Sequence, residues 1–342
     1  MVKKCKIAFG SYRKMKELYL ANMWPQMVTE RGVRLFEQNG FETSGNWLNK
    51  KVNYQNADKI VLPYADFGQP ILITEATPEL WGKVVSYILF PDSLIGWDHE
   101  KRKYLFQKNP KAEQILLKSP NKLSHSKFSS QLADTTYGYM QNVTIPLGVD
   151  TDSIKNSVAD KHNGLRVLWN HMWRSDKGTY EAFDLISDLA PKYPNVEFWI
   201  GQTDTWETQR DKASFRQQCE SKLKTLQNMG NVRFFNRIRD QKEYWSWLNQ
   251  ADIGFSTAFQ EGFGLSMMEQ EAAGIACVIP NAEVYPELHV GCLIVERPKL
   301  SEGLQVLLED PNKRKFISQG CVDNASKYDT SIWVKSLTDQ LK

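Results

Sequence analysis

The chain has 342 residues, 41% hydrophobic and 24% charged, with a formal net charge of +3. That length suits two domains, each large enough to bury its own core. No apolar run approaches the ~20 residues of a membrane-spanning helix. The basic start MVKKCKIAFG lacks the apolar region and cleavage site of a secretory signal. The sequence therefore predicts a cytoplasmic protein without membrane insertion.

In the first half, apolar runs alternate with helical stretches, which favours parallel strands joined by crossover helices. A helix is predicted from Met23 to Gln38, where apolar residues recur at helical spacing. Residues 1–150 are therefore predicted to form a Rossmann-like domain. Its predicted strands cover residues 6–11, 58–63, 71–77, 114–119 and 142–148.

The second half repeats this alternation, so residues 151–325 are predicted to form a second Rossmann-like domain of the same α/β class. Residues 326–342 are predicted to form a helix that crosses back onto the first domain. The predicted strands cover residues 165–171, 196–202, 232–238, 251–257, 276–281 and 292–296, and the predicted helices lie near 179–193, 207–229, 240–249 and 264–274.

The segment that joins the halves contains DTD, with carboxylates at Asp150 and Asp152. This pattern is that of a metal-binding D-x-D motif, but it follows a Gly-containing strand exit and has no other hard ligands nearby. We interpret it as the passage between domains, with a metal role as the alternative.

The cysteines and histidines suggest no metal site. The cysteines are odd in number and widely spaced, without a C-x-x-C pair or a His partner at ligand spacing. They are predicted to be reduced core thiols. The five cysteines are Cys5, Cys219, Cys277, Cys292 and Cys321.

The segment EGFGLSMME places Glu261 and Glu269 on either side of a glycine turn that opens a predicted helix, directly after a predicted strand. A strand, a tight turn and a helix N-terminus present unpaired N–H groups and partial positive charge, which suits a nucleotide diphosphate. The two carboxylates could accept hydrogen bonds from sugar and ribose hydroxyls. Glycine turns and solvated Glu residues are common, so this motif alone is weak.

A second motif follows the first strand of the second half, in WNHMWRSDKG. Arg174 and Lys177 lie in a loop that leads into a helix, where cations could bind a diphosphate. The alternative is that both are ordinary solvated charges of a loop.

Together these segments, with VYPEL after them, resemble the retaining glycosyltransferase family that carries an E-x7-E motif on a B-type fold of two Rossmann-like domains facing a cleft. The resemblance implies transfer of a sugar from a nucleotide-sugar co-substrate with retention of configuration. It implies neither a cofactor nor a metal.

The resemblance also implies roles for single residues. Glu261 would lie near the transferred sugar and Glu269 on the ribose, while Lys177 and Arg174 would neutralise the diphosphate. The family's usual Arg is replaced by Met172, so either Arg174 takes its role or Lys177 and backbone dipoles suffice. Backbone donors to phosphate would come from Gly262, Phe263, Gly264 and Leu265, and Gly10 and Ser11 would approach the donor across the cleft.

A narrower family, the tRNA-queuosine mannosyltransferases, has segments similar to WNHMW, the E-x-FG turn and VYPE, and these segments occur there in the same order. This similarity covers about residues 165–296. It does not visibly extend to the first 120 residues, so it concerns the donor half and only hints at the acceptor.

The acceptor side is interpreted from charge. Residues 1–150 carry 20 Lys+Arg against 14 Asp+Glu, or +6, which leaves 23 against 26, or −3, for residues 151–342. Basic residues next to aromatics fit a polyanionic acceptor, although a solvated basic face is an equal alternative. The candidate acceptor residues are Asp98, His99, Lys101, Arg102 and Lys103.

These observations favour transfer to a modified base of nucleic acid, with a hydroxymethylated DNA base of bacteriophage type slightly preferred over tRNA. If the chain is phage-encoded, its location would be the host cytoplasm. One alternative is a glycan, lipid or small-molecule acceptor. Another is an inactive nucleic-acid-binding protein with a transferase fold, which the missing Arg at Met172 leaves open.

Overall fold

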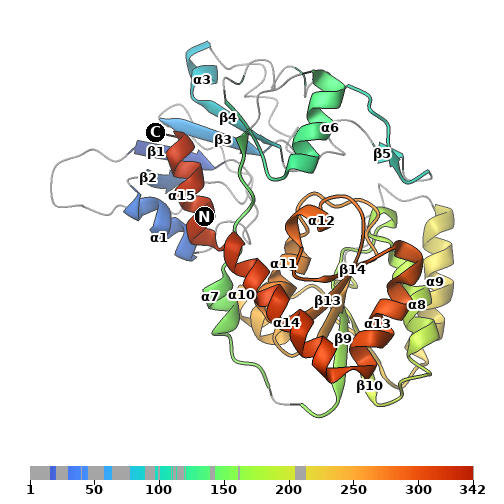
Figure 1. Ribbon diagram of the computed structural model, residues 1–342. Coiled ribbons are helices and arrows are strands. Elements are labelled where there is room, and N and C mark those ends of the chain that lie inside the picture. The colour runs from blue at the N-terminus through green and yellow to red at the C-terminus, as the bar shows by residue number, and fades with distance from the viewer. Residues whose placement is uncertain are drawn as a thin grey trace. The chain divides into compact units, whose positions relative to one another are not determined.

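The computed structural model divides into two compact units (Figure 1). The first unit comprises Met1–Asp98, Lys103–Asp150 and Tyr328–Lys342, and the second comprises His99–Arg102 and Thr151–Lys327. The structure describes residues 16–20, 30–39, 41–44, 58–63, 78–88, 97–98, 101–108, 110, 113, 119, 121–138, 143–160, 162–204 and 213–341.

The first unit contains a six-stranded parallel sheet of order β2-β1-β3-β4-β7-β8. Its central strands are rich in β-branched and aromatic residues, and Val61, Val84, Val85 and Tyr87 are buried. The strands are β1 (Lys16–Leu20), β2 (Phe41–Ser44), β3 (Lys59–Pro63), β4 (Val84–Ile88), β7 (Asn121–Ser124) and β8 (Val143–Thr144), with a separate hairpin of β5 (Trp97–Asp98) and β6 (Lys103–Tyr104).

The helices of this unit are α1 (Glu30–Gln38), α3 (Pro78–Gly82), α6 (Lys127–Tyr137) and the C-terminal α15 (Thr330–Leu341). Helix α15 packs on α1 (Figure 1), with Trp333 edge-on to Phe36 at 5.6 Å between ring centroids. Arg31 of α1 donates to Asp329 at 2.7 Å and to Asp150 at 3.2 Å. The Asp150 carboxylate is therefore held by an ion pair at the passage between domains.

The second unit contains a parallel sheet of order β11-β10-β9-β12-β13-β14. This is the strand order of a doubly wound dinucleotide-binding domain, and the direction of succession reverses between β9 and β12. The strands are β9 (Leu165–Trp169), β10 (Val196–Ile200), β11 (Val232–Phe234), β12 (Ile253–Phe255), β13 (Ala276–Pro280) and β14 (Leu293–Val295).

Helices cover this sheet (Figure 1), and a continuous apolar core lies between them and the strands. The β13 strand ACVIP is buried along its whole length. The helices are α7 (Thr151–Lys155), η2 (Ser175–Lys177), α8 (Thr179–Leu189), α9 (Ala213–Gln227), α10 (Gln241–Leu248), α11 (Leu265–Ala272), α12 (Tyr285–Leu288), η3 (Arg297–Lys299), α13 (Leu300–Glu309) and α14 (Pro311–Ala325), followed by η4 (Ser326–Tyr328).

The predicted α/β class with two Rossmann-like domains is confirmed, and each of the six strands predicted in the second half is present. The first half was predicted less well. Strands β1, β2, β4 and β7 were missed, as were helices α13 and α14 in the second half. The predicted strands at 6–11 and 71–77, most of 114–119, and the start of the helix from Met23 lie outside the described residues.

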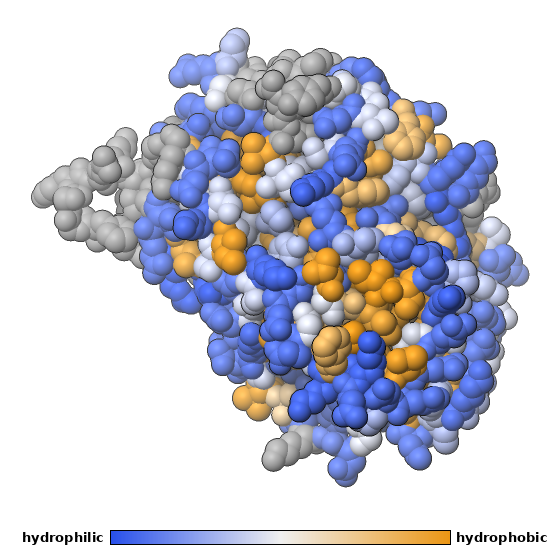
Figure 2. Space-filling model, viewed as in Figure 1, coloured by the Kyte–Doolittle hydropathy of each residue, from blue (hydrophilic) through white to orange (hydrophobic). Residues whose placement is uncertain are grey.

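The surface is mainly hydrophilic on the face that Figure 2 shows, with hydrophobic residues in scattered groups. None of the helices in the described part of the chain combines the length and the apolar character needed to span a bilayer.

Candidate functional site

The candidate site lies in the second unit, where the loops after β9 and β12 meet. In open parallel sheets, ligands bind at the carboxyl ends of the strands where the strand order reverses. The β9 loop runs through η2 to Gly178 and opens α8, and the β12 loop runs to Gly264 and opens α11. Both sequence motifs therefore come to the same edge of the sheet.

The two loops pack backbone to backbone at Gly178. This residue has φ 67°, and a Cβ there would lie 2.3 Å from the carbonyl oxygen of Thr257. The Thr257 hydroxyl lies 3.0 Å from the carbonyl oxygens of both Lys177 and Gly178, and it accepts from Trp169 Nε1 at 3.1 Å. Glycine is needed here because both the conformation and the close approach exclude a side chain.

A second glycine forms the turn into α11. Gly264 has φ 77°, and a Cβ there would lie 2.5 Å from Nε2 of His289. That nitrogen lies 2.8 Å from the carbonyl oxygen of Phe263, and the other ring nitrogen pairs with Glu271. Gly264 supplies no side-chain cap, so the first turn of α11 keeps backbone N–H groups available for a ligand.

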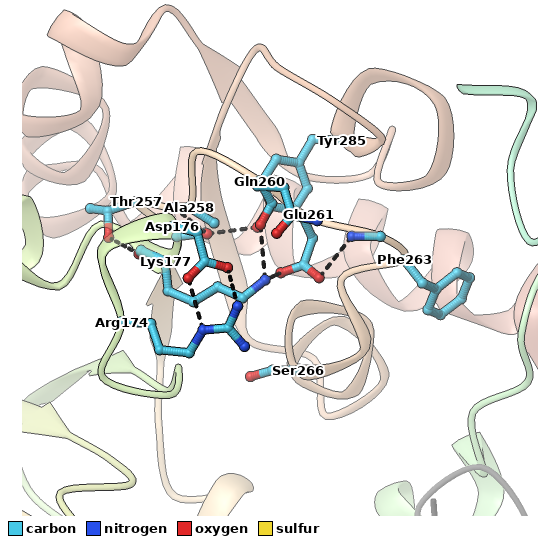
Figure 3. Close-up of polar contacts among 12 residues, drawn as sticks. Arg174, Asp176, Lys177, Thr257, Ala258, Gln260, Glu261, Phe263, Ser266 and Tyr285 are labelled. Carbon is cyan, nitrogen blue, oxygen red and sulfur yellow. Dashed lines mark hydrogen bonds and ion pairs between the residues drawn. The ribbon is translucent and has the colours of Figure 1, made fainter. Parts of the chain in front are cut away.

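Lys177 and Glu261 form the central pair of the site (Figure 3). Lys177 Nζ lies 3.1 Å from Glu261 Oε2 and 2.9 Å from the carbonyl oxygen of Gln260, while the Gly262 N–H donates to Glu261 Oε1 at 3.1 Å. Burial alone would raise the pKa of Glu261, but the charge of Lys177, with the hydrogen bonds from Lys177 and Gly262, holds it below its ordinary value. Glu261 is therefore an ionised carboxylate beside a cation.

Arg174 is occupied by a neighbouring acid. Its guanidinium binds both carboxylate oxygens of Asp176 at 2.8 Å, and both side chains are buried (Figure 3). The backbone carbonyl of Asp176 accepts from Phe259 and Gln260 at 2.7 and 3.1 Å, which joins the two loops again. Because Arg174 is bound to Asp176, this arrangement favours neutralisation of the diphosphate by Lys177 and backbone dipoles. A diphosphate role for Arg174, in place of the family's Arg at the position of Met172, stays a prediction.

Glu269 lies on α11 and is connected to two side chains that the sequence did not single out. It accepts from the Tyr244 hydroxyl at 2.8 Å, and that hydroxyl accepts from Asn170 Nδ2 at 2.9 Å. Burial, and then the charge of Glu269, raises the pKa of Tyr244 well above its ordinary value, so Tyr244 remains a donor. One carboxylate oxygen is thus taken by Tyr244, which leaves the other for a ligand hydroxyl.

Nucleotide-sugar binding should strengthen with pH through this residue. Burial raises the pKa of Glu269 to about 7, against the opposing effect of the Tyr244 hydrogen bond. The ionised fraction then rises from about one tenth at pH 6 to about nine tenths at pH 8, so the dissociation constant should fall by up to about tenfold. Calorimetry with a nucleotide-sugar, whose diphosphate does not titrate in this range, measures the change.

Two variants sharpen this test. Glu269→Gln should bind weakly and without the pH dependence. Tyr244→Phe removes a donor to the carboxylate, so it should move the midpoint to higher pH. A pH dependence that persists in Glu269→Gln would assign it to another group.

The remaining predicted site residues are placed as follows. Gly10, Ser11 and His99 lie outside the described residues. Asp98 is half-buried in β5, and Lys101 and Lys103 are exposed. Arg102 belongs to the second unit, where it pairs with Glu181 and lies 3.9 Å from the centroid of the Phe259 ring. Its guanidinium is therefore engaged within the second unit.

Arg297 is a further residue that sequence analysis missed. Its guanidinium donates to the carbonyl oxygens of Thr257 and Ala258 at 2.7 Å and lies 3.8 Å from the Phe259 ring centroid. Tyr285 bonds the Ser256 hydroxyl at 2.7 Å. Both side chains support the β12 loop. The motif VYPEL, which contains Tyr285, was the sequence signal that could have identified this residue.

Three cysteines come together in the core, contrary to their wide spacing in sequence. Cys277, Cys292 and Cys321 have sulfur atoms within 4.8 Å of one another. The neighbouring Glu271 and His289 have their polar atoms engaged by each other, by Asn324 and by Phe263. Cys292 also forms a second group of possible metal ligands with Glu271 and His289, which the wide spacing in sequence did not predict. Asp150 and Asp152 belong to no such ligand group within the described ranges.

A site of this kind, on the second of two Rossmann-like units, defines the class of B-type glycosyltransferases. Residues 150–320 match the family Glycosyl transferases group 1. The chain belongs to this family.

Solved structures share the fold. An E. coli trehalose-6-phosphate structure bound with UDP-2-fluoro glucose aligns with TM-score 0.68 at 13% identity, over 95% of this chain and 99% of that chain. A UDP-forming alpha,alpha-trehalose-phosphate synthase from Burkholderia vietnamiensis aligns with TM-score 0.69 at 12% identity, over 95% and 99%. At these identities the alignments show the fold alone.

A curated relative supports the narrower resemblance predicted from the donor half. The tRNA-queuosine alpha-mannosyltransferase of Drosophila melanogaster is 27% identical over 125 residues, which is 36% of this chain and 30% of the relative. The match thus spans less than a third of the length of that relative.

Proposed function

We propose that this protein transfers a sugar from a nucleotide-sugar to an acceptor hydroxyl, with retention of anomeric configuration. The observation that carries the proposal is the partly buried Lys177–Glu261 pair beside the N-terminus of α11. Family membership supports it, and so does the UDP-sugar analogue named with the E. coli structure.

The roles follow from charge. The transition state carries positive charge on the sugar ring and negative charge on the departing diphosphate. The Lys177 ammonium has three N–H groups, of which two reach Gln260 and Glu261. The third, with the N–H groups of the first turn of α11, stabilises the leaving phosphate. Glu261 binds the sugar, and a leaving phosphate oxygen takes the acceptor proton, so no protein base is required.

Turnover should survive chelation, because Lys177 and helix dipoles neutralise the diphosphate in this mechanism. Rates measured with and without EDTA should agree within about twofold. Complete loss in EDTA, restored by manganese or magnesium, would instead revive Asp150 and Asp152 as metal ligands.

The proposal is tested with a panel of nucleotide-sugars. Slow hydrolysis of one donor, abolished by Glu261→Gln, is the expected result. No binding and no hydrolysis of any donor would favour the alternative of an inactive nucleic-acid-binding protein. Analysis of the released sugar by NMR reports whether configuration is retained.

As the acceptor we propose a hydroxyl on a modified base of nucleic acid, with a phage-type hydroxymethylated DNA base preferred over tRNA. The +6 charge of residues 1–150 supports a polyanion. The Drosophila relative, whose name specifies a tRNA nucleoside, supports a nucleic acid over a glycan, lipid or small molecule. A sugar phosphate is the second candidate, favoured by a similar synthase structure from Burkholderia xenovorans in complex with glucose-6-phosphate.

The acceptor test uses Lys101→Glu with Lys103→Glu, because both side chains are exposed. Arg102 is left unchanged so that its ion pair with Glu181 is kept. Affinity for DNA or RNA should fall steeply with salt, and this variant should flatten the slope by roughly 0.9 per lost duplex contact. Donor hydrolysis should not change. If nucleic acid does not bind at low salt while glucose-6-phosphate accepts the sugar, the second candidate is correct.

Nucleoside mass spectrometry identifies the product. DNA and tRNA incubated separately with the active donor should yield a hexosyl or pentosyl adduct in one of them. An adduct in tRNA alone would overturn the preference for DNA.

A further inference from the structure

A chain of side-chain hydrogen bonds ends at Glu269. Gln202 Nε2 donates to Asn170 Oδ1 at 3.1 Å, and Asn170 Nδ2 donates to the Tyr244 hydroxyl at 2.9 Å. The Tyr244 hydroxyl in turn donates to Glu269 Oε2 at 2.8 Å. The four residues come from the loops after β9 and β10 and from helices α10 and α11, so separate elements of the second unit supply the chain.

The Glu269 carboxylate sets the direction of every bond in this chain. An ionised carboxylate only accepts, so Tyr244 must give it the single proton of its hydroxyl. The Tyr244 oxygen can then only accept from its other partner, which requires that Asn170 turns its NH₂ group towards Tyr244. The Asn170 oxygen is left facing Gln202, whose NH₂ group donates to it. Each residue therefore donates towards Glu269, and the chain has one donor for every acceptor.

The backbone fixes the first two residues of the chain. Asn170 is 1% exposed, and a Cβ at Gly201 would lie 2.6 Å from its Oδ1 atom, so no larger residue fits beside it. Gln202 has φ 58°, a left-handed conformation that costs energy for a residue with a Cβ. Such conformations cluster at functional sites. The strained backbone brings the Gln202 amide to Asn170, which points to a functional role for this contact.

One oxygen of Glu269 remains for a ligand. Tyr244 occupies Oε2, whereas Oε1 has no hydrogen-bond partner among the described residues and is not sealed from solvent. The Tyr244 bond also lowers the pKa of Glu269 against the larger effect of burial, which favours the ionised form. An ionised oxygen accepts from a hydroxyl and repels a phosphate. In a nucleotide-sugar, the hydroxyls predicted to lie near Glu269 are those of the ribose.

We infer that Gln202 and Asn170 are positioning residues, which direct the Tyr244 proton to Glu269 so that the free carboxylate oxygen receives a ribose hydroxyl. They thereby determine the preference of the site for ribonucleotides over deoxyribonucleotides. A deoxyribonucleotide that lacks this hydroxyl leaves the oxygen unpaired, and that loss is the source of the discrimination. This inference rests on the proposed function.

The test is Gln202→Glu, which keeps the shape of the side chain but presents only oxygen. Asn170 should then turn its NH₂ group to the new carboxylate and its oxygen to Tyr244. With an acceptor at both ends of the chain, the single Tyr244 proton can no longer serve both Asn170 and Glu269.

Calorimetry measures the consequence with the diphosphates of uridine, guanosine and adenosine, each beside its 2′-deoxy and 3′-deoxy counterparts. For the diphosphate that binds, the unmodified chain should prefer ribose by about tenfold over at least one deoxy form. This preference should fall to about threefold or less in Gln202→Glu, while affinity for that deoxy form changes by no more than about twofold. A merely structural role of Gln202 would weaken both forms alike.

Two further variants complete the test. In Tyr244→Phe the preference should already be reduced, and adding Gln202→Glu should change it no further, because both act through one hydroxyl. Gln250→Glu is the matched control for the added charge and should keep the full preference. Its side chain accepts from Arg166 at 3.0 Å near the start of β9, away from the loops that follow the strands.

An unchanged preference in Gln202→Glu, or equal weakening of the ribose and deoxyribose forms, would overturn the inference. A further loss of preference in the double variant would also overturn it. An unmodified chain that hydrolyses a donor but shows no ribose preference would contradict the inference and leave the proposed transfer intact. If the unmodified chain binds no diphosphate and hydrolyses no donor, the proposed function itself fails.

Discussion

Replacing Lys177 with methionine is expected to reduce turnover by roughly 10²–10³-fold, the loss typical when a preorganised donor to a developing anion is removed. Methionine keeps much of the side-chain volume but provides no N–H group. The Lys177–Glu261 contact of 3.1 Å would be lost, and the partly buried carboxylate would have no cation beside it. The pKa of Glu261 should then rise, because the charge of Lys177 is the largest influence that lowers it. Steady-state hydrolysis of the donor at several pH values measures both effects.

Two further variants separate chemistry from stability. Lys177→Met combined with Glu261→Gln removes the uncompensated charge, so stability should recover while turnover stays low. Lys222→Met is the surface control, because Lys222 pairs with the partly exposed Asp184 on α8. Turnover within fivefold of the unmodified chain in Lys177→Met would remove Lys177 from the catalytic role.

The second unit was predictable because its strands are short apolar runs. β13 is buried along its whole length, and such strands read as continuous hydrophobic segments. The strand–turn–helix at Glu261–Glu269 also has a local signal, since Gly264 must adopt φ 77°. Local patterns of this kind need no knowledge of distant contacts.

The first unit was harder because several of its strands carry no such signal. β7 has the sequence NKLS, in which only the last two residues are buried, and β2 is the four-residue segment FETS. β4, with the sequence VVSYI, is different: its β-branched and aromatic residues were a usable signal. α14 was missed because its apolar residues do not gather on one face and Gly320 interrupts it.

The pairings in the site depend on contacts between residues far apart in sequence. The motif predicted that Lys177 and Glu261 share a site, but not that Asp176 occupies Arg174. Tyr244 reaches Glu269 from α10, and nothing in its local sequence distinguishes it from a core aromatic. The cluster of Cys277, Cys292 and Cys321 likewise arises only when β13, the segment before β14 and α14 pack together.

Gly178→Ala should destabilise the second unit by roughly 2–5 kcal/mol and abolish most turnover. The residue has φ 67°, which costs an alanine energy, and the new Cβ would lie 2.3 Å from the Thr257 backbone oxygen. Relief requires the β9 and β12 loops to separate, which would displace Lys177 from Gln260 and Glu261. Urea unfolding followed by tryptophan fluorescence measures the stability, and donor hydrolysis measures the activity.

Gly274→Ala is the matched control for the backbone conformation. Gly274 follows α11 with φ 76°, but a Cβ there would meet its nearest atom, Val322 Cγ2, at an ordinary 3.5 Å. This variant should cost only about 1–2 kcal/mol, because it carries the left-handed strain without the steric clash. The difference between the two variants is then the contribution of the backbone contact that holds the two loops together. If both variants lose equal stability, the close approach at Gly178 does not position the Lys177–Glu261 pair.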